Sequence, residues 1–512
     1  MKRCFFQFAR LYAWPQARQF IHATENPRES QARVLERIVR DLKLTEYGKH
    51  WGILSTTDFR RRLPIVSYDD LTEWIERQKR CESGVLVHGA VQFYEKTSGS
   101  TGPSKYIPYT RALRKSFSRM FLIWAHDVIS GIPEMGQGKL YFSISPSFDV
   151  EISTESGVPI GLEDDADYLG EGLKHLLAPF LLMPEGISSI EDPERFKQAV
   201  CLALLRESSL ESISIWNPSF LRVLLDWIRA HRDELIEELG EELNSERLAA
   251  LQLEEIDWPG VWPDLKFISC WADANAKPLA KDLARLFPGV MVQGKGLLAT
   301  EAPMTIPMLG VEGGVPLVDE VYFEFETASG KLLELHELEA GETYEMIISQ
   351  KGGLVRYRMG DYVRVVSLFH QTPTLEFVGR GNTVSDLVGE KLSESFVRKA
   401  LEELGLKETG FRCLMPLREP TEGYVLVLDK VAGEAKELEL RLEAILNEAF
   451  HYRHARQLGQ LSPLKVVCEP AIESLLGDYY IRAGKRWGDM KSTCLLTTPL
   501  DAPLLRALGL LP

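Results

Sequence analysis

The spacing of apolar and polar residues divides the chain into stretches with a helical period and stretches that alternate like strands. Apolar residues three and four positions apart predict amphipathic helices, whereas strict alternation predicts half-buried strands. In the first half of the chain this pattern predicts helices at 1–20, 27–42, 112–129, 192–207 and 219–238. It predicts strands at 91–95, 106–109 and 139–144.

A strand, a helix and a second strand follow one another at 265–271, 278–287 and 290–293. This βαβ spacing implies parallel pairing, with a ligand crevice beyond the carboxyl ends of the strands. The next segment, Gly-Lys-Gly-Leu-Leu-Ala-Thr-Glu, is therefore expected to deliver the hydroxyl of Thr300 and the carboxylate of Glu301 to the mouth of that crevice.

Later in the chain the pattern changes to short alternating runs at 321–325, 344–348, 354–357 and 362–365, separated by glycine-bearing turns. Such runs predict an antiparallel subdomain. After a glycine-rich stretch, mixed helical and strand patterns continue from residue 392. We therefore predict an α/β protein with a large N-terminal domain, residues 1–384, that combines parallel βαβ and antiparallel sheets. A small mobile α+β domain, residues 385–512, follows a hinge.

Composition narrows the class of protein. The chain has 512 residues, is 45% hydrophobic and carries a net charge of −15, which is typical of a globular enzyme and argues against nucleic-acid binding. Its seven scattered cysteines favour neither a disulfide framework nor a zinc site, so we expect a reducing cytoplasm as its location. We also expect a monomer. No apolar run reaches the roughly 20 residues of a membrane span. Residues 1–20 are interpreted as a packed helix, with an amphipathic membrane-contacting helix as the alternative.

The strongest candidate for chemistry is the stretch Thr97, Ser98, Gly99, Ser100, Thr101 and Gly102, followed by Lys105. Its two glycines can adopt positive φ, so that successive backbone N–H groups and hydroxyls converge on an anion. The spacing does not fit the common phosphate loop. Taken alone, the stretch can also be a solvated Ser/Gly turn.

Two later motifs have ordinary interpretations when they stand alone. The run from Tyr357 to Asp361, Tyr-Arg-Met-Gly-Asp, is typical of a hairpin turn with Gly-Asp at its tip. Trp216 and Phe220, where a strand feeds a helix, are expected in the core, with a role in lining a substrate pocket as the alternative.

Taken in order, the loop, Ala299-Thr300-Glu301, the Asp361 motif, Arg380 and Gly389-Glu390-Lys391 resemble the adenylate-forming superfamily of acyl-CoA synthetases and luciferases. The runs 322–325, 341–345, 353–361 and 389–394 are more specifically similar to the Gretchen Hagen (auxin-responsive) acyl-acid amido synthetases. The similarity extends from about residue 26 to residue 494.

The resemblance implies that ATP converts a carboxylic acid to an acyl adenylate with release of pyrophosphate, and that the acyl group then passes to an amine, commonly that of an amino acid. It assigns phosphate binding to residues 97–102 and Lys105. Ala299 and Thr300 would contact the nucleotide, Glu301 would bind Mg²⁺, and Asp361 would bind the ribose hydroxyls. It assigns catalytic cations to Arg380, Lys391 and Lys491.

The chain departs from the family pattern at two places. Asp489 stands where the family has Gln before Lys491, and Leu297 stands where plant members carry Tyr. The resemblance leaves two alternatives open. One is a ligase that forms a thioester with coenzyme A or a carrier thiol, and the other is a binder of nucleotide or carboxylate that no longer catalyses a reaction.

Overall fold

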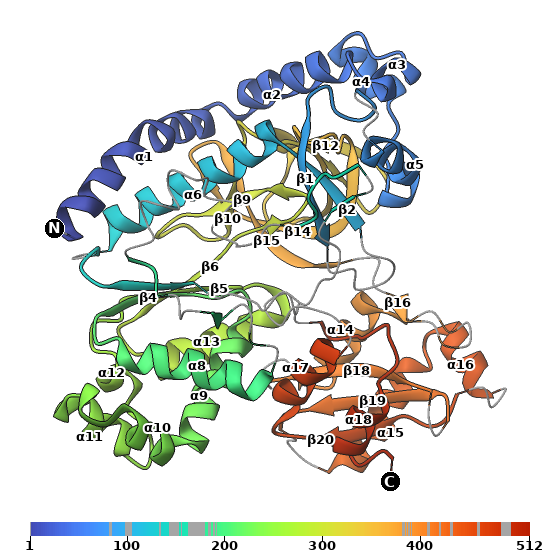
Figure 1. Ribbon diagram of the computed structural model, residues 1–512. Helices are drawn as coiled ribbons and strands as arrows, with labels where there is room; N and C mark the ends of the chain where they lie inside the picture. Colours follow the sequence, from blue (N-terminus) through green and yellow to red (C-terminus); the bar gives the residue numbers. More distant parts are fainter. Residues whose placement is uncertain are drawn as a thin grey trace.

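The computed structural model describes residues 2–80, 84–97, 105–132, 135–142, 153–154, 156–161, 180–182, 186–187, 190, 192–380, 384–385, 387, 390, 392–406, 410–418, 421–430, 434–457, 461–482 and 493–511. Three main sheets organise these residues (Figure 1). A seven-stranded antiparallel sheet lies beneath the N-terminal helices, a four-stranded parallel sheet lies below it, and a three-stranded sheet carries the C-terminal part of the chain.

The parallel sheet has the strand order β3-β4-β5-β6. Its strands are β3 (Lys139–Phe142), β4 (Leu210–Ser214), β5 (Phe267–Cys270) and β6 (Met291–Gly294). All three neighbouring pairs are parallel, which confirms the predicted βαβ unit. Its apolar residues share one core with the helices α8 (Pro193–Arg206), α9 (Pro218–Ala230), α10 (Arg232–Leu239), α11 (Ser245–Gln252), α12 (Trp258–Val261) and α13 (Lys277–Leu286).

The prediction of one continuous helix at 219–238 is wrong, because two helices, α9 and α10, occupy this segment. At His231 the backbone leaves helical geometry, with φ −111° and ψ 24°. The His231 ring stacks on Trp227 with centroids 4.1 Å apart, so the junction between α9 and α10 is packed in place.

The antiparallel sheet has the order β12-β11-β13-β14-β15-β10-β9. Its strands are β9 (Thr305–Pro307), β10 (Gly314–Pro316), β11 (Tyr322–Glu326), β12 (Leu332–Glu334), β13 (Thr343–Ser349), β14 (Tyr357–Phe369) and β15 (Thr372–Arg380). Their apolar faces form a core with the helices α2 (Pro27–Leu42), α3 (Glu46–His50), α4 (Thr56–Arg62) and α5 (Tyr68–Lys79). The helix α1 (Lys2–Glu25) lies along α6 (Arg111–Gly131) (Figure 1).

The hairpin turn considered for the Tyr-Arg-Met-Gly-Asp motif does not form. Glu345 of β13 pairs with Tyr362, and Ile347 pairs with Arg358. Three residues of β14, from Met359 to Asp361, therefore bulge opposite Met346 alone. Gly360 has φ 77°, a backbone angle that glycine adopts at little cost. The bulge redirects the side chain of Asp361, the residue after Gly360.

In its described residues, the C-terminal part combines the strands β18 (Arg412–Leu417), β19 (Gly423–Leu428) and β20 (Lys465–Cys468) with five helices. The helices are α14 (Glu394–Glu403), α15 (Ala435–Leu446), α16 (Phe450–Gln457), α17 (Ile472–Arg482) and α18 (Ala502–Ala507). The short strands β16 (Val384–Ser385) and β17 (Leu392–Ser393) precede them. The domain boundary at residues 384 and 385 stays a prediction.

The helix α17 joins the C-terminal part to the helices of the parallel sheet. Its Ile481 packs against the core of that sheet, and α17 contacts α9. Glu473 at the start of α17 has its Oε1 atom buried without a hydrogen-bond partner among the described residues. Burial raises the pKa of Glu473 to about 7, while Asp429, Asp226 and Asp282 add negative charge and Arg222 opposes them. The contact therefore favours a neutral carboxyl group.

Glu473 should make the stability of the protein depend on pH. Its folded-state pKa is raised, so the stabilisation is complete below the unfolded-state pKa of about 4.3 and is lost as pH rises through 7, a change of about 3–4 kcal/mol. Replacing it, Glu473→Gln, should flatten this dependence and raise the melting temperature at pH 8 relative to the parent. Calorimetry at pH 5 and pH 8 tests this, with the exposed Glu437→Gln as control. A parallel decline of parent and Glu473→Gln would contradict it.

Candidate functional site

A two-stranded hairpin presents the candidate phosphate loop. β1 (Val91–Thr97) and β2 (Lys105–Thr110) are antiparallel, with Thr97 opposite Lys105 at the end of the ladder. The residues that connect these strands, including Ser98, Gly99, Ser100, Thr101 and Gly102, lie outside the described residues, as does the Thr97 side chain. The two strands that the sequence predicts on either side of the loop, at 91–95 and 106–109, are therefore confirmed.

Lys105 is held near the base of this loop by an aromatic neighbour. Its Nζ lies 5.5 Å from the centroid of the Tyr68 ring. The Tyr68 hydroxyl accepts a hydrogen bond from the backbone N–H of Tyr106 at 2.7 Å. Burial raises the pKa of Tyr68, so the ring is a neutral phenol that fixes the strand without cancelling the charge of Lys105. Tyr68 could not be predicted as a neighbour of Lys105 from the sequence, since it stands 37 positions earlier in the chain.

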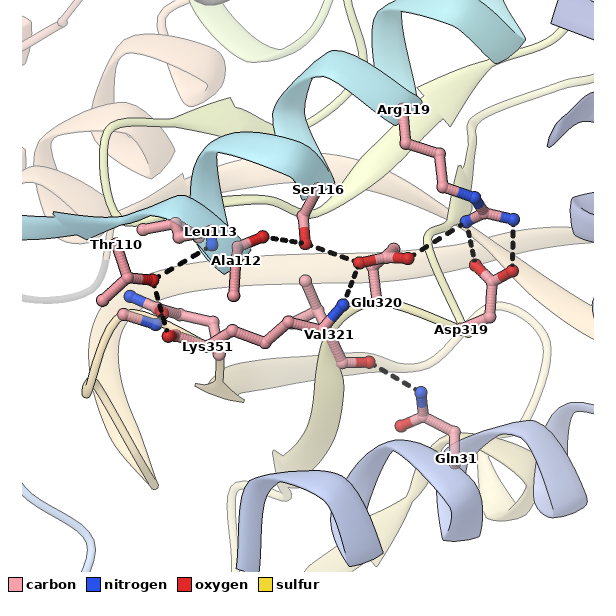
Figure 2. Close-up of polar contacts among 12 residues, drawn as sticks. Gln31, Thr110, Ala112, Leu113, Ser116, Arg119, Asp319, Glu320, Val321 and Lys351 are labelled. Atoms are coloured by element: carbon pink, nitrogen blue, oxygen red, sulfur yellow. Dashed lines mark hydrogen bonds and ion pairs between the residues drawn. The ribbon is translucent and has the colours of Figure 1, made fainter. Parts of the chain in front are cut away.

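A buried polar network ties the hairpin to the antiparallel sheet (Figure 2). Thr110, where β2 ends, caps α6 by accepting from the Leu113 N–H at 3.1 Å and donates to the Lys351 carbonyl at 2.9 Å. One turn further along α6, Ser116 donates to Glu320 at 2.5 Å. Lys351 also forms an ion pair with Glu320.

The same network continues to Arg119, whose guanidinium binds both oxygens of Asp319 at 2.6 and 2.7 Å (Figure 2). Burial opposes ionisation of Glu320, but Lys351, Ser116 and Arg119 together hold its pKa below the usual range. Paired charges of this kind fix geometry, because a charge left without its partner in the interior is costly. The start of α6, and with it the end of β2, therefore has a defined position.

The second motif forms a tight turn. β7 (Leu298–Ala299) and β8 (Ala302–Pro303) are antiparallel, so Thr300 and Glu301 occupy the turn between them. The Tyr109 hydroxyl of β2 donates to the Thr300 carbonyl at 2.6 Å, which joins this turn directly to the strand that carries Lys105. Two segments separated by almost 200 positions thus meet at one place.

Glu301 is only 7% exposed, and no residue in the described part of the chain gives its carboxylate a hydrogen bond or an ion pair. An ionised carboxylate at such a position favours a cation or donor from a ligand. Leu297, at the position where plant members of the resembling family carry Tyr, is buried in the core of the antiparallel sheet. This side chain contributes to packing.

The third motif brings Asp361 to the rim of the antiparallel sheet. Asp361 is 4% exposed and stands opposite Arg380 in the ladder between β14 and β15. Burial raises the pKa of the neighbouring Glu345, and the negative charge of Asp361 adds to this, while Arg358 opposes it. The Arg380 side chain and all of Lys391 and Lys491 lie outside the described residues, so their roles stay predictions.

The carboxyl ends of β4, β5 and β6 supply further groups. Lys295, directly after β6, donates to the Ser214 hydroxyl at 2.8 Å and lies 4.9 Å from the Trp216 ring centroid. Trp271, directly after β5, has its ring 6.1 Å from that of Trp216. Trp216 is half-buried at this edge, whereas Phe220 is in the core. Of these two residues, only Trp216 is therefore placed where it could line a substrate pocket.

Asp273 connects this edge to the antiparallel sheet. Its Oδ2 accepts from the Phe377 N–H of β15 at 3.4 Å, and burial raises its pKa to about 6. Lys277 and Glu376 form a second link between the same segments at 2.7 Å. The edge of the parallel sheet thereby adjoins the strand that ends at Arg380, opposite Asp361. Lys295, Trp271 and Asp273 were not among the predicted site residues, although their position directly after parallel strands is a signal that could have identified them.

Two groupings that the described residues do not form bear on the chemistry. Within the ranges that the structure covers, no three His, Cys, Asp or Glu side chains come together as a metal-binding group. Among those same residues, no helix combines the length and apolar character needed to cross a membrane.

Comparisons with known proteins agree with the motifs. A family model described as the GH3 family N-terminal domain matches residues 16–292, and one described as the GH3 family central domain matches residues 314–380. The first model alone covers more than half of the chain. The predicted resemblance to Gretchen Hagen acyl-acid amido synthetases is therefore confirmed.

Several relatives align over most of their length. The chain is 23% identical to indole-3-acetic acid-amido synthetase GH3.3 of Arabidopsis thaliana, with 93% of this chain and 91% of the relative covered. It is 24% identical to 4-substituted benzoates-glutamate ligase GH3.12 of the same plant, covering 93% and 94%. It is 24% identical to jasmonoyl--L-amino acid synthetase JAR6 of Nicotiana attenuata, covering 75% and 74%.

Solved structures establish the fold. The structure of AtGH3.15 acyl acid amido synthetase in complex with 2,4-DB superposes with a TM-score of 0.79 at 19% identity, covering 97% of this chain and 96% of that one. A second structure of GH3.15 acyl acid amido synthetase gives 0.74 at 18% identity, covering 96% and 95%. The predicted α/β fold is confirmed, and it is the fold of these acyl acid amido synthetase structures.

Proposed function

This chain belongs to the GH3 family, and from that premise we propose that it is an AMP-forming acyl-acid amido synthetase. It uses ATP to activate a carboxylic acid as an acyl adenylate and transfers the acyl group to an amine, that of an amino acid. The observation that carries the proposal is the family match over residues 16–292, together with relatives named as acid-amido synthetases that align over nearly their whole length.

The activation step needs charge stabilisation around the α-phosphorus. One oxygen of the substrate carboxylate attacks that phosphorus, an acyl–oxygen–phosphorus linkage forms, and the bond to the bridging oxygen breaks as pyrophosphate leaves with the electron pair. Residues 97–102 and Lys105 would hold the phosphates, and Thr300 would contact the α-phosphate. Donors fixed before the reaction begins stabilise such developing charge strongly. The network from Thr110 to Arg119 keeps β2 in place for this task.

Glu301 fits a role as a magnesium ligand. Mg²⁺ commonly takes one or two protein carboxylates and completes its shell with water and substrate phosphates, so a three-residue cluster is not required. Glu301 offers a carboxylate with no partner among the described residues, on the turn tied to β2. A bound Mg²⁺ would neutralise charge on the phosphates. Thr300 and Glu301 would therefore orient the reacting phosphate.

Transfer to the amine follows at the same site. The amine nitrogen attacks the acyl carbon, the carbon–nitrogen bond forms, the bond from the acyl carbon to the AMP oxygen breaks, and the nitrogen loses a proton to solvent. We propose that Lys491 and Lys391 come from a small domain, residues 385–512, that turns between the two steps, and that Arg380 binds phosphate or ribose near the hinge. The scattered cysteines support a cytoplasmic location for this chemistry.

Asp361 should govern nucleotide affinity. A buried carboxylate that accepts from two ribose hydroxyls makes charge-assisted bonds worth about 1.5–3 kcal/mol, so Asp361→Asn should weaken ATP binding about 10- to 100-fold. Titration calorimetry with ATP measures this, with Asp233→Asn, an exposed change on α10, as control. Unchanged ATP affinity in Asp361→Asn would remove this residue from the nucleotide site.

Product analysis tests the proposed function. Indolic, benzoic and fatty acids should be crossed with a panel of amino acids and with coenzyme A, and carboxylate-dependent exchange of labelled pyrophosphate into ATP should be measured for each acid. We expect exchange with at least one acid and an amide with at least one amino acid. A requirement for coenzyme A without any amide would favour the thioester ligase, and absence of exchange with every acid would favour a binder.

A further inference from the structure

The first helices form a ridge along one edge of the molecule. We use the term N-terminal ridge for α1 to α4, residues 2–62, which follow one another along the upper edge in Figure 1. The inner face of α1 is buried, with Phe6, Ala13 and Phe20 at most 3% exposed. Its other faces look away from the protein body.

Large apolar side chains are exposed on this ridge. On α1, Phe8 is 56%, Leu11 67%, Tyr12 54% and Trp14 49% exposed, and the first three share one helix face through their spacing. Of the thirteen large hydrophobic side chains that are exposed among the described residues, seven belong to the ridge: Phe8, Leu11, Tyr12, Trp14, Ile21, Leu44 and Leu54. The other six are spread over the rest of the chain, so the apolar surface is concentrated here.

Positive charge is concentrated on the same segment. Residues 1–62 contain 13 Lys and Arg against six Asp and Glu, a net charge of +7 in a chain whose total is −15. Arg28, Arg37 and Arg40 are exposed on α2, and Arg60, Arg61 and Arg62 are exposed on α4. The Arg18 guanidinium lies over the Trp14 ring at 5.3 Å, so charge and aromatic surface adjoin directly.

We propose that the N-terminal ridge docks the enzyme on an anionic lipid bilayer, lying in the interface without crossing it. Exposed Phe, Leu, Tyr and Trp beside Lys and Arg are the groups that insert at the boundary between headgroups and acyl chains and attract anionic lipid. A nucleic acid would leave the leucines without an apolar partner. Two copies joined ridge to ridge would place like charges against each other. This surface is independent of the proposed acyl chemistry.

Vesicle sedimentation of the full chain tests the proposal. Vesicles of phosphatidylcholine with about 30% phosphatidylserine should sediment the protein at low salt, and pure phosphatidylcholine should not. Raising the salt to about 0.5 M should release it, because screening shortens the range of the attraction. The double change Arg28→Gln with Arg37→Gln should weaken binding about 25-fold, at about fivefold for each charge.

The apolar contribution is tested separately. The double change Phe8→Ser with Leu11→Ser should lower vesicle binding by at least about tenfold, whereas Leu253→Ser with Leu440→Ser, exposed residues outside the ridge, should leave it unchanged. Melting temperatures confirm that each variant is folded. Equal sedimentation with and without phosphatidylserine, or no effect of the Phe8 and Leu11 changes, would overturn the proposal. A vesicle-independent dimer that these changes abolish would assign the ridge to a second copy.

Discussion

Replacing Glu301 by Gln is expected to lower acid-dependent pyrophosphate exchange by about 10³-fold or more, which corresponds to about 4 kcal/mol of transition-state stabilisation. The amide keeps the shape of the side chain but removes the negative charge that would hold Mg²⁺. Because Glu301 has no protein partner in the described part of the chain, the change breaks no hydrogen bond or ion pair among those residues. The melting temperature should therefore stay within the experimental error of the parent.

Glu312→Gln is the matched control, since Glu312 is an exposed carboxylate eleven positions further along the chain. It should exchange pyrophosphate at the parental rate. Rates should be measured over a range of magnesium concentrations, because a weakened magnesium site regains part of its activity at high metal. Parental rates in Glu301→Gln at every magnesium concentration would show that another group holds the metal.

Replacing Arg356 by Met should destabilise the protein by about 3–5 kcal/mol, because it leaves a buried charge without its partner. The Arg356 guanidinium binds both oxygens of Glu324 at 2.8 and 2.9 Å and donates to the Leu63 carbonyl at 2.7 Å. The side chains of Arg356 and Glu324 are only 6% and 7% exposed. Arg356 also has φ 48°, an angle that a residue other than glycine rarely adopts. The interactions of its side chain therefore hold the backbone in an unfavourable conformation.

Thermal unfolding measures this effect, and a fall in melting temperature of roughly 3–5 °C is expected, because the unfolding entropy of a chain of 512 residues makes each kcal/mol worth about 1 °C. Arg33→Met is the control, because Arg33 and its partner Glu29 are 52% and 68% exposed and such surface pairs contribute little. A melting temperature of Arg356→Met equal to that of the parent within experimental error would mean that the Arg356–Glu324 pair adds no net stability.

The family motifs could be recognised from sequence, but their physical roles could not. The runs containing Glu324, Glu345, Arg356 and Arg358 carry the family resemblance, and the structure shows that they are joined by ion pairs across β11, β13 and β14. Arg358 binds Glu345 at 2.7 Å and Glu326 at 2.6 Å, as Arg356 binds Glu324. Partners up to 32 positions apart do not reveal themselves in a local pattern. These residues form the framework that presents Asp361.

Local periodicity predicted the sheets well because strands and helices in those segments follow a simple pattern. The parallel order of β5 and β6, and the turn that holds Thr300 and Glu301 beyond them, were both expected from a βαβ spacing. The bulge at Gly360 was not, because glycine before Asp is as typical of a hairpin turn as of a bulge. Tyr68 and Asp273 reach the site through tertiary contacts that only the folded chain creates.

Transfer of heavy oxygen from the acid to AMP tests the central claim most directly. The substrate acid, labelled with heavy oxygen in its carboxylate, should be incubated with ATP, magnesium and an amino acid that supports amide formation. Activation through an acyl adenylate predicts that each amide formed leaves one labelled oxygen in AMP. The carboxylate oxygen that attacked the phosphorus stays bonded to it when the amine displaces AMP from the acyl carbon. Formation of ADP with the label in inorganic phosphate, or of AMP without label, would contradict the account.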